Sequence, residues 1–316
     1  MNWFILSLIT MLCWGAADLF YKKSSVDEDS YSHLKIAVWV GLVMGICALC
    51  LLPFTETGFT AYNLGISAIK YMPASIAYIV SMVIGYAGMR YLEASIISPV
   101  QNASGAFSVI AMALYFLAIG QMGDFAEEFS SLDVIGTVIV VIGVIALAIV
   151  EKKSEPCEDN GLMAISIPAL VFPLLYCLFD TIGTAADGII LDEDAGLGLG
   201  EIDVLVLYGL TFMLFGLGSW IYLWIRTGKP YNPFTKNELK TKAIAACFEE
   251  GGQVFYVFAM AMKPMLAAPM IASYCIVSVI LLRLFVKEKL SKSKWTCIFT
   301  VIIGIVILGI SEGLAS

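Results

Sequence analysis

The sequence predicts an all-α integral membrane protein, in which ten transmembrane helices form two inverted five-helix repeats. Three observations predict this fold class: a shortage of charged residues, apolar runs long enough to cross a bilayer, and a similarity between the two halves of the chain. Of the 316 residues, 60% are hydrophobic and only 14% are charged, whereas about a quarter of the residues of a soluble domain are charged. Most of the surface must therefore face lipid. The apolar runs are continuous rather than alternating, which favours helices over a barrel.

A transmembrane helix needs about 17–25 consecutive, mainly apolar residues. The stretch 57–72 is less apolar and contains Asn63 and Lys70, so it predicts either an interfacial helix or an extension of the third span. The first span lacks a basic leader and a cleavage site, so we interpret it as permanent rather than as a signal peptide. The ten predicted spans are residues 3–21, 34–54, 72–90, 95–119, 133–150, 162–184, 202–225, 243–262, 266–286 and 294–311.

The two halves of the chain are similar in sequence. Residues 139–147 (IVVIGVIAL) match residues 300–308 (TVIIGIVIL), with Gly143 aligned to Gly304. Other aligned positions are Pro99 with Pro269, Tyr86 with Tyr256, and residues 14–18 with 176–180. We therefore predict one repeat over residues 1–153 and a second over residues 154–316. Because five spans are an odd number, the second repeat is inverted relative to the first, as in many secondary transporters. A monomer is then sufficient to enclose a pseudo-symmetric cavity.

The positions of the basic residues predict an orientation. When charges are assigned to the nearest loop, every Lys and Arg except Lys70 and Lys263 falls in an odd-numbered loop. Cytoplasmic loops are enriched in Lys and Arg. We therefore expect a multi-pass protein of the plasma membrane with both termini external.

Two aromatic and carboxylate pairs occupy equivalent places in the two halves. Asp18 lies near the end of the first span, four residues after Trp14 and on the same helix face. Asp180 stands in the same relation to Tyr176 in the sixth span. A carboxylate beside an aromatic face suits a cation. The alternative is that Asp18 pairs with Lys22 and that both aspartates lie at the water interface.

The eighth span carries Glu249, Gln253 and Tyr256 on one face. Glu249 lies well inside the span, where a carboxyl group tends to keep its proton. This predicts a role in solute binding or in proton coupling, and the alternative is a structural bond between helices.

Four further polar side chains are candidates for lining a solute site. Tyr78 and Ser81 lie on the third span and Asn102 on the fourth, while Tyr274 faces inward if the ninth span mirrors the fourth. Each of them could instead make an ordinary interhelical hydrogen bond. Acidic residues outnumber basic ones within the spans, which favours a positively charged, zwitterionic or aromatic solute over an anion.

The sequence predicts no metal and no cofactor. His33 is the single histidine, and every cysteine except Cys157 lies inside an apolar run, so neither a metal-ligand spacing nor a disulfide framework is indicated. Nothing suggests a nucleic-acid partner. The expected partners are the lipid bilayer, a small-molecule solute and protons as a coupling ion.

Three stretches resemble the drug/metabolite transporter superfamily, in its ten-span EamA-type branch. They are Trp14-Gly15, residues 87–109 (AGMRYLEASIISPVQNASGAFSV), and residues 259–279 (AMAMKPMLAAPMIASYCIVSV) followed by the loop 287–291. The resemblance covers nearly the whole chain. It implies a carrier of amino acids, nucleotide sugars, drugs, choline or other metabolites, with a cavity lined mainly by spans 1, 3, 4, 6, 8 and 9. Family members are often drawn with cytoplasmic termini, opposite to the orientation that the charges predict.

The function that the sequence predicts is secondary transport by alternating access, and not an enzymatic activity. Within the superfamily, the alternatives are a multidrug carrier and a sugar- or nucleotide-type carrier. Two alternatives come from other classes. One is an intramembrane aspartyl protease with Asp18 and Asp180 as its dyad, and the other is a membrane receptor or assembly subunit.

Overall fold

The part of the chain that the computed structural model describes consists of helices joined by short loops, and this part is residues 1–24, 29, 31–56, 60–91, 103–120, 129–153, 167–192, 196–285 and 290–315. The all-α class is thereby confirmed. The helices are α1 (Trp3–Ser24), α2 (Ser32–Leu51), α3 (Ala61–Tyr91), α5 (Ser104–Ile119), α7 (Ser131–Lys153), α8 (Ile167–Ile190), α9 (Glu201–Thr227), α10 (Lys236–Glu238), α11 (Ile244–Met262), α12 (Pro264–Ala272), α13 (Tyr274–Phe285) and α14 (Lys292–Ala315), with short turns η1 (Leu52–Phe54) and η2 (Leu239–Ala243).

Six of the described helical segments are long and apolar enough to cross a membrane. Their outward faces carry large apolar side chains, such as Ile303 and Val306 of α14, which are more than half exposed. Such faces are suited to lipid rather than water. These helices agree with a multi-pass membrane protein, while the count of ten spans stays a prediction. The six are Trp3–Ser24, Ser32–Phe54, Tyr62–Gly85, Glu201–Thr227, Pro264–Phe285 and Lys292–Ala315, and two shorter apolar segments are Ser104–Ile119 and Ser131–Leu147.

Two predicted spans differ in detail from the helices observed. Helix α3 runs without a break from Ala61 to Tyr91, so the stretch from residue 61 to 72 extends the third span, while residues 57–59 lie outside the described residues. The ninth span is divided into α12 and α13 at Ser273. The proline ring of Pro269 supplies no backbone N–H to the helix ladder, and the Ser273 hydroxyl donates to the Met270 carbonyl oxygen at 2.5 Å.

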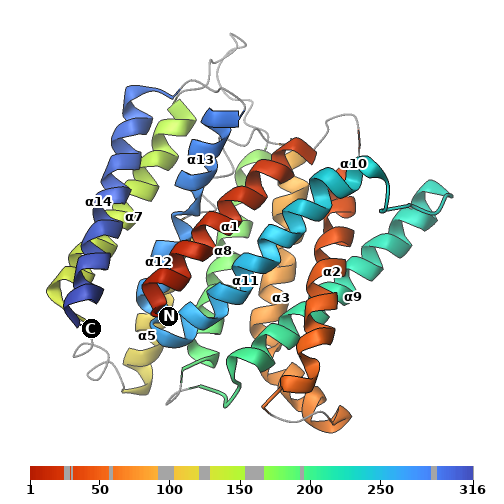
Figure 1. Ribbon diagram of the computed structural model, residues 1–316, viewed down its shortest axis with the longest axis horizontal. Coiled ribbons are helices and arrows are strands. Elements are labelled where there is room, and N and C mark those ends of the chain that lie inside the picture. Colours follow the sequence, from red (N-terminus) through yellow and green to blue (C-terminus); the bar gives the residue numbers. More distant parts are fainter. Residues whose placement is uncertain are drawn as a thin grey trace.

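The most extensive helix–helix contacts join the first half of the chain to the second. Helix α1 packs on α11, α3 on α8, α2 on α9, and α7 on α14. Smaller contacts join α1 to α13, α5 to α8 and α5 to α12. In Figure 1, the pair of α7 and α14 lies on one side of the bundle and the pair of α2 and α9 on the other, with α1, α3, α8 and α11 between them.

Glycine residues allow close packing in the two outer helix pairs, α2 with α9 and α7 with α14. A Cβ atom added to Gly216 of α9 would lie 2.9 Å from the Cα of Gly41 on α2. On the other side of the bundle, a Cβ added to Gly304 of α14 would lie 2.8 Å from a methyl group of Val140 on α7, and Gly143 of α7 faces Val301 of α14 in return. Small residues at such contacts let membrane helices pack backbone to backbone.

Substituting Gly216 with alanine is expected to lower the melting temperature of the detergent-solubilised protein. The added methyl group has no room against α2, and overpacking of this kind typically costs about 1–3 kcal/mol. Gly218→Ala is the matched control, because a Cβ at Gly218 would meet nothing within 4 Å. Equal melting temperatures for the two variants would contradict the close packing of α2 and α9.

Polar side chains form hydrogen bonds and ion pairs at both ends of the bundle. Trp3 donates its indole N–H to the Glu312 carboxylate at 2.5 Å, so the two termini lie at the same end, as Figure 1 also shows. At the other end, Lys35 forms an ion pair with Asp29, with Nζ and Oδ2 2.7 Å apart, and Lys242 forms one with Glu238 at 2.8 Å.

The ion pair of Asp29 and Lys35 predicts a pH dependence of stability. Partial burial raises the pKa of Asp29, but the hydrogen bond from Lys35 and the backbone N–H of Tyr31 outweigh it, so the pKa lies below the ordinary aspartate value. A lowered pKa contributes stability above the unfolded-state pKa, and this stability is lost as the pH falls through the folded-state pKa.

We therefore expect Asp29→Asn to destabilise the protein slightly at neutral pH, by about 0.2–1 kcal/mol as is typical of a solvent-accessible ion pair, and to weaken the loss of stability on acidification. Melting temperatures of both proteins across the acid range would measure this. If the difference in melting temperature between the wild type and the variant stays constant down to the lowest pH, the ion pair of Asp29 and Lys35 does not cause the pH dependence.

Candidate functional site

An aromatic cluster formed by Trp14, Tyr256 and Tyr274 lies where α1, α11 and α13 meet. The Trp14 ring centroid lies 5.3 Å from that of Tyr256 and 5.8 Å from that of Tyr274, with the latter ring edge-on. The Trp14 indole N–H donates to the Glu249 carbonyl oxygen at 3.2 Å. This position is possible because Gly252 has no side chain: a Cβ there would lie 2.5 Å from the indole nitrogen. The cluster therefore unites three of the side chains that the sequence singled out.

Two carboxyl groups lie beside the aromatic cluster. Glu249 is only 6% exposed, and its carboxylate accepts a hydrogen bond from the Tyr21 hydroxyl of α1. Asp18, one turn before Tyr21, receives a hydrogen bond from Ser278 of α13. The two acids are close enough to repel one another. A group of acids and aromatic rings at one place is suited to a cation.

The alternative that Asp18 pairs with Lys22 near the water interface also has support. Lys22 lies near enough to Asp18 to attract it electrostatically, and the Asp18 side chain is partly rather than fully buried. Asp18 is thus placed between a basic residue at the helix end and the aromatic cluster.

Asp180 lies farther from the helix end than the sequence predicted, because α8 continues to Ile190. Its carboxylate accepts a hydrogen bond of 2.5 Å from the Ser104 hydroxyl of α5. Tyr176, one turn earlier, is buried at 8% exposure. The two halves therefore hold their equivalent aspartates in a similar way, each bonded by a serine of a neighbouring helix.

A second polar group connects α3, α8 and α11. The hydroxyls of Tyr78 and Tyr256 are hydrogen-bonded at 2.7 Å, and the Tyr78 hydroxyl lies 3.4 Å from that of Thr184. Ser81 is fully buried and donates to the Tyr78 carbonyl oxygen of its own helix at 2.9 Å. Gln253 is 3% exposed, and its amide nitrogen has no hydrogen-bond partner among the described residues. Tyr256 belongs to both groups and links them.

One predicted side chain cannot be placed, and others were missed. Asn102 lies outside the described residues. Tyr21 and Tyr71 were not predicted, and neither was Asp187, which is completely buried in α8. The signal for Asp187 was present, because it follows Asp180 by two helical turns and so shares its face. The predicted span ended at residue 184, which assigned Asp187 to a loop.

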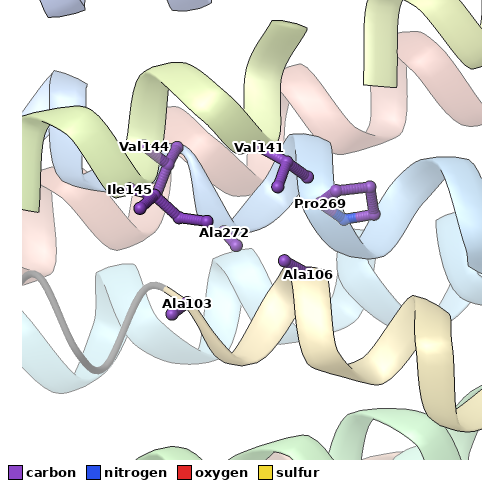
Figure 2. A pocket seen from close by; sticks show the side chains of 7 residues that line it. All are labelled: Ala103, Ala106, Val141, Val144, Ile145, Pro269 and Ala272. Atoms are coloured by element: carbon purple, nitrogen blue, oxygen red, sulfur yellow. The ribbon is translucent and has the colours of Figure 1, made fainter. Parts of the chain in front are cut away.

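A small pocket between α5, α7 and α12 has no part in this site. The space that it encloses is about 10 Å³, close to the minimum that one water molecule needs. Figure 2 shows that its lining is aliphatic, so it offers no group to orient a polar solute. The lining residues are Ala103, Ala106, Val141, Val144, Ile145, Pro269 and Ala272.

The described residues hold no group of three or more His, Cys, Asp or Glu side chains that could bind a metal ion.

Comparison with known proteins adds support for the fold alone. No family model matches the chain, and no match was found among curated proteins. The chain is similar to a solved structure titled "Crystal structure of protein", with 12% sequence identity, a TM-score of 0.62 and coverage of 99% of each chain. At this identity the similarity concerns the arrangement of helices along the whole chain.

Proposed function

We propose that the protein is a secondary transporter, which moves a small solute across the plasma membrane by alternating access between two inverted five-helix repeats. The observation that carries the proposal is the interior site of aromatic and carboxyl side chains, which is assembled from helices of both halves. Carrier sites are typically found at such a repeat interface, in the interior of the bundle.

The helix packing supports the inverted repeat. In the proposed repeat, α1 corresponds to α8, α2 to α9, α3 to α11, and α7 to α14. When each helix is replaced by its counterpart in the other half, the contact of α1 with α11 becomes the contact of α8 with α3. The contacts of α2 with α9 and of α7 with α14 are converted into themselves. A two-fold pseudo-symmetry axis requires this set of contacts, and rocking about such an axis would expose the site to each side in turn.

The chemistry of the site favours an amine or an amino acid as the solute. Asp18 and Glu249 supply negative charge, while Trp14 and the tyrosines supply ring faces for a cation. Among the described residues, Lys22 is the basic group that acts on this cluster, and it lies at the end of α1. A multidrug carrier would use the same rings for larger aromatic cations. The alternative is a sugar- or nucleotide-type carrier of the drug/metabolite transporter superfamily. We do not propose a proteolytic dyad, since the Asp18 carboxyl group is bonded to α13 and that of Asp180 to α5.

Coupling to protons is part of the proposal, with Glu249 as the site that the sequence predicts. Tyr21 and the Trp14 indole hold the side chain and the backbone of Glu249 beside the rings. A solute ammonium group would therefore displace a proton from this carboxyl group as it binds.

The proposal is tested with purified protein and a panel of primary amines, quaternary ammonium ions, amino acids, sugars and nucleotides. A ligand that binds only the folded protein raises its melting temperature, and any ligand that does so is then tested for saturable uptake into liposomes with and without the protein. We expect amines or amino acids to stabilise the protein and to be taken up. Stabilisation by sugars or nucleotides alone would overturn the solute class, and binding without flux would overturn transport.

The proposed orientation has both termini outside the cell. An epitope tag at either terminus should then be accessible to antibody on intact cells. Accessibility only after permeabilisation would reverse the orientation.

A further inference from the structure

Asp187 is a fully buried carboxyl group near the C-terminal end of α8. Its exposure is 0%, and among the described residues its oxygens make no close hydrogen bond, although three tyrosine hydroxyls lie near them. An ionised carboxylate in such a place is strongly disfavoured unless an opposite charge or several donors accompany it. The neutral, protonated form avoids this penalty.

The groups that surround Asp187 do not provide a compensating charge. The hydroxyls of Tyr71 and Tyr78 face it from α3, and that of Tyr256 faces it from α11. The charged neighbour on its own helix is Asp180, a second acid. Beside Gly188, the neighbours from α5, α11 and α12 are apolar: Met112, Met260 and Pro264.

The tyrosines connect Asp187 to the aromatic cluster. Tyr71 is 1% exposed, and within the described part of the chain its hydroxyl makes no close hydrogen bond, with Asp187 as the polar group beside it. Tyr78 is already bonded to Tyr256 at 2.7 Å, and the Tyr256 ring lies against Trp14. Tyr78 and Tyr256 thus connect Asp187 to the site where the solute is expected.

We propose that Asp187, rather than Glu249 as the sequence predicts, binds the proton that drives transport, and that Asp18 and Glu249 bind the solute. The role in coupling rests on the proposed transport function, whereas proton binding itself does not. On one side of the membrane an O–H bond forms at a carboxyl oxygen of Asp187 as a hydronium ion gives up its proton and becomes water. On the other side that bond breaks and water takes the proton. If Tyr78 and Tyr256 relay it, each hydroxyl donates its proton while it accepts another, so neither ring becomes charged.

Infrared spectroscopy of the full-length protein in lipid tests proton binding without any solute. A protonated carboxyl group without a hydrogen bond gives a carbonyl stretching band at unusually high frequency. We expect this band in the wild type at neutral pH and its loss in Asp187→Asn. Asp133→Asn is the matched control, because Asp133 is also buried, at 5% exposure, but accepts a hydrogen bond from the Ser130 backbone N–H at 2.9 Å.

A second variant keeps the carboxyl group and alters its surroundings. Tyr71→Phe removes a hydroxyl that faces Asp187 and should shift the band without abolishing it. A band that is unchanged in Asp187→Asn would overturn the proposal. So would a rise of melting temperature in sodium chloride over potassium chloride that Asp187→Asn abolishes, because the site would then bind sodium.

Uptake of tetraphenylphosphonium, an aromatic cation, into liposomes with an imposed pH gradient tests the coupling. We expect Asp187→Asn to lose accumulation driven by the gradient but to retain exchange of labelled for unlabelled cation. Gradient-driven accumulation equal to that of the wild type would overturn the coupling role. If the wild type itself takes up no tetraphenylphosphonium, the transport proposal fails for this solute, and the infrared band still decides whether Asp187 holds a proton.

Discussion

Glutamine in place of Glu249 is expected to weaken the binding of amines by about 10–100-fold. This range corresponds to the loss of a hydrogen bond to a charged group, about 1.5–3 kcal/mol. The amide keeps the size of the side chain and can still accept a hydrogen bond from Tyr21, so the fold should persist. Melting temperatures measured at increasing amine concentration yield the affinities of the wild type and the variant.

The neighbouring acid offers a matched control. Glu250 follows Glu249 directly but points to α2, where its carboxyl group contacts Cys47. Glu250→Gln should therefore bind amines as the wild type does, although it loses the same charge from the same helix. Equal losses of affinity in both variants would mean that the net charge of the bundle, and not Glu249, attracts the solute.

The all-α class and many residues of the candidate site could be predicted from the sequence, because both depend on local patterns. The apolar runs alone require helices, and helical spacing alone places Trp14 with Asp18 on one face of α1 and Glu249 with Tyr256 on one face of α11. The glycines of the repeated segment, Gly143 and Gly304, do lie at one helix–helix contact.

Other features could not be predicted, because they depend on contacts between distant residues or on where a helix breaks or ends. No spacing in the sequence relates Tyr21 of α1 to Glu249 of α11, although their side chains are bonded. The division of the ninth span at Ser273 depends on local backbone geometry. Asp187 was missed because the predicted span ended at residue 184, whereas α8 continues to Ile190 and Asp187 is buried within it.

Trp14 can adopt its conformation only because Gly252 has no side chain. We therefore expect Gly252→Ala to disrupt solute binding, although the substitution adds only one methyl group. The new methyl group would overlap the indole ring, because a Cβ at this position lies 2.5 Å from its nitrogen. Trp14 would have to rotate away, which breaks its hydrogen bond to the Glu249 carbonyl oxygen and its contacts with Tyr256 and Tyr274. A displaced ring of this size should reduce amine affinity at least about tenfold, since an aromatic contact with a desolvated cation contributes about 2 kcal/mol.

Gly251 separates this effect from a general effect of alanine in α11. A Cβ at Gly251 would come no closer than 4.0 Å to the nearest side chain, that of Cys13, so Gly251→Ala should bind amines normally. Both substitutions raise helix propensity by the same amount, about 1 kcal/mol, and they differ only in whether Trp14 has room. If Gly252→Ala binds amines as tightly as Gly251→Ala does, then the indole ring is not part of the solute site, and the cation must be held by the carboxyl groups alone.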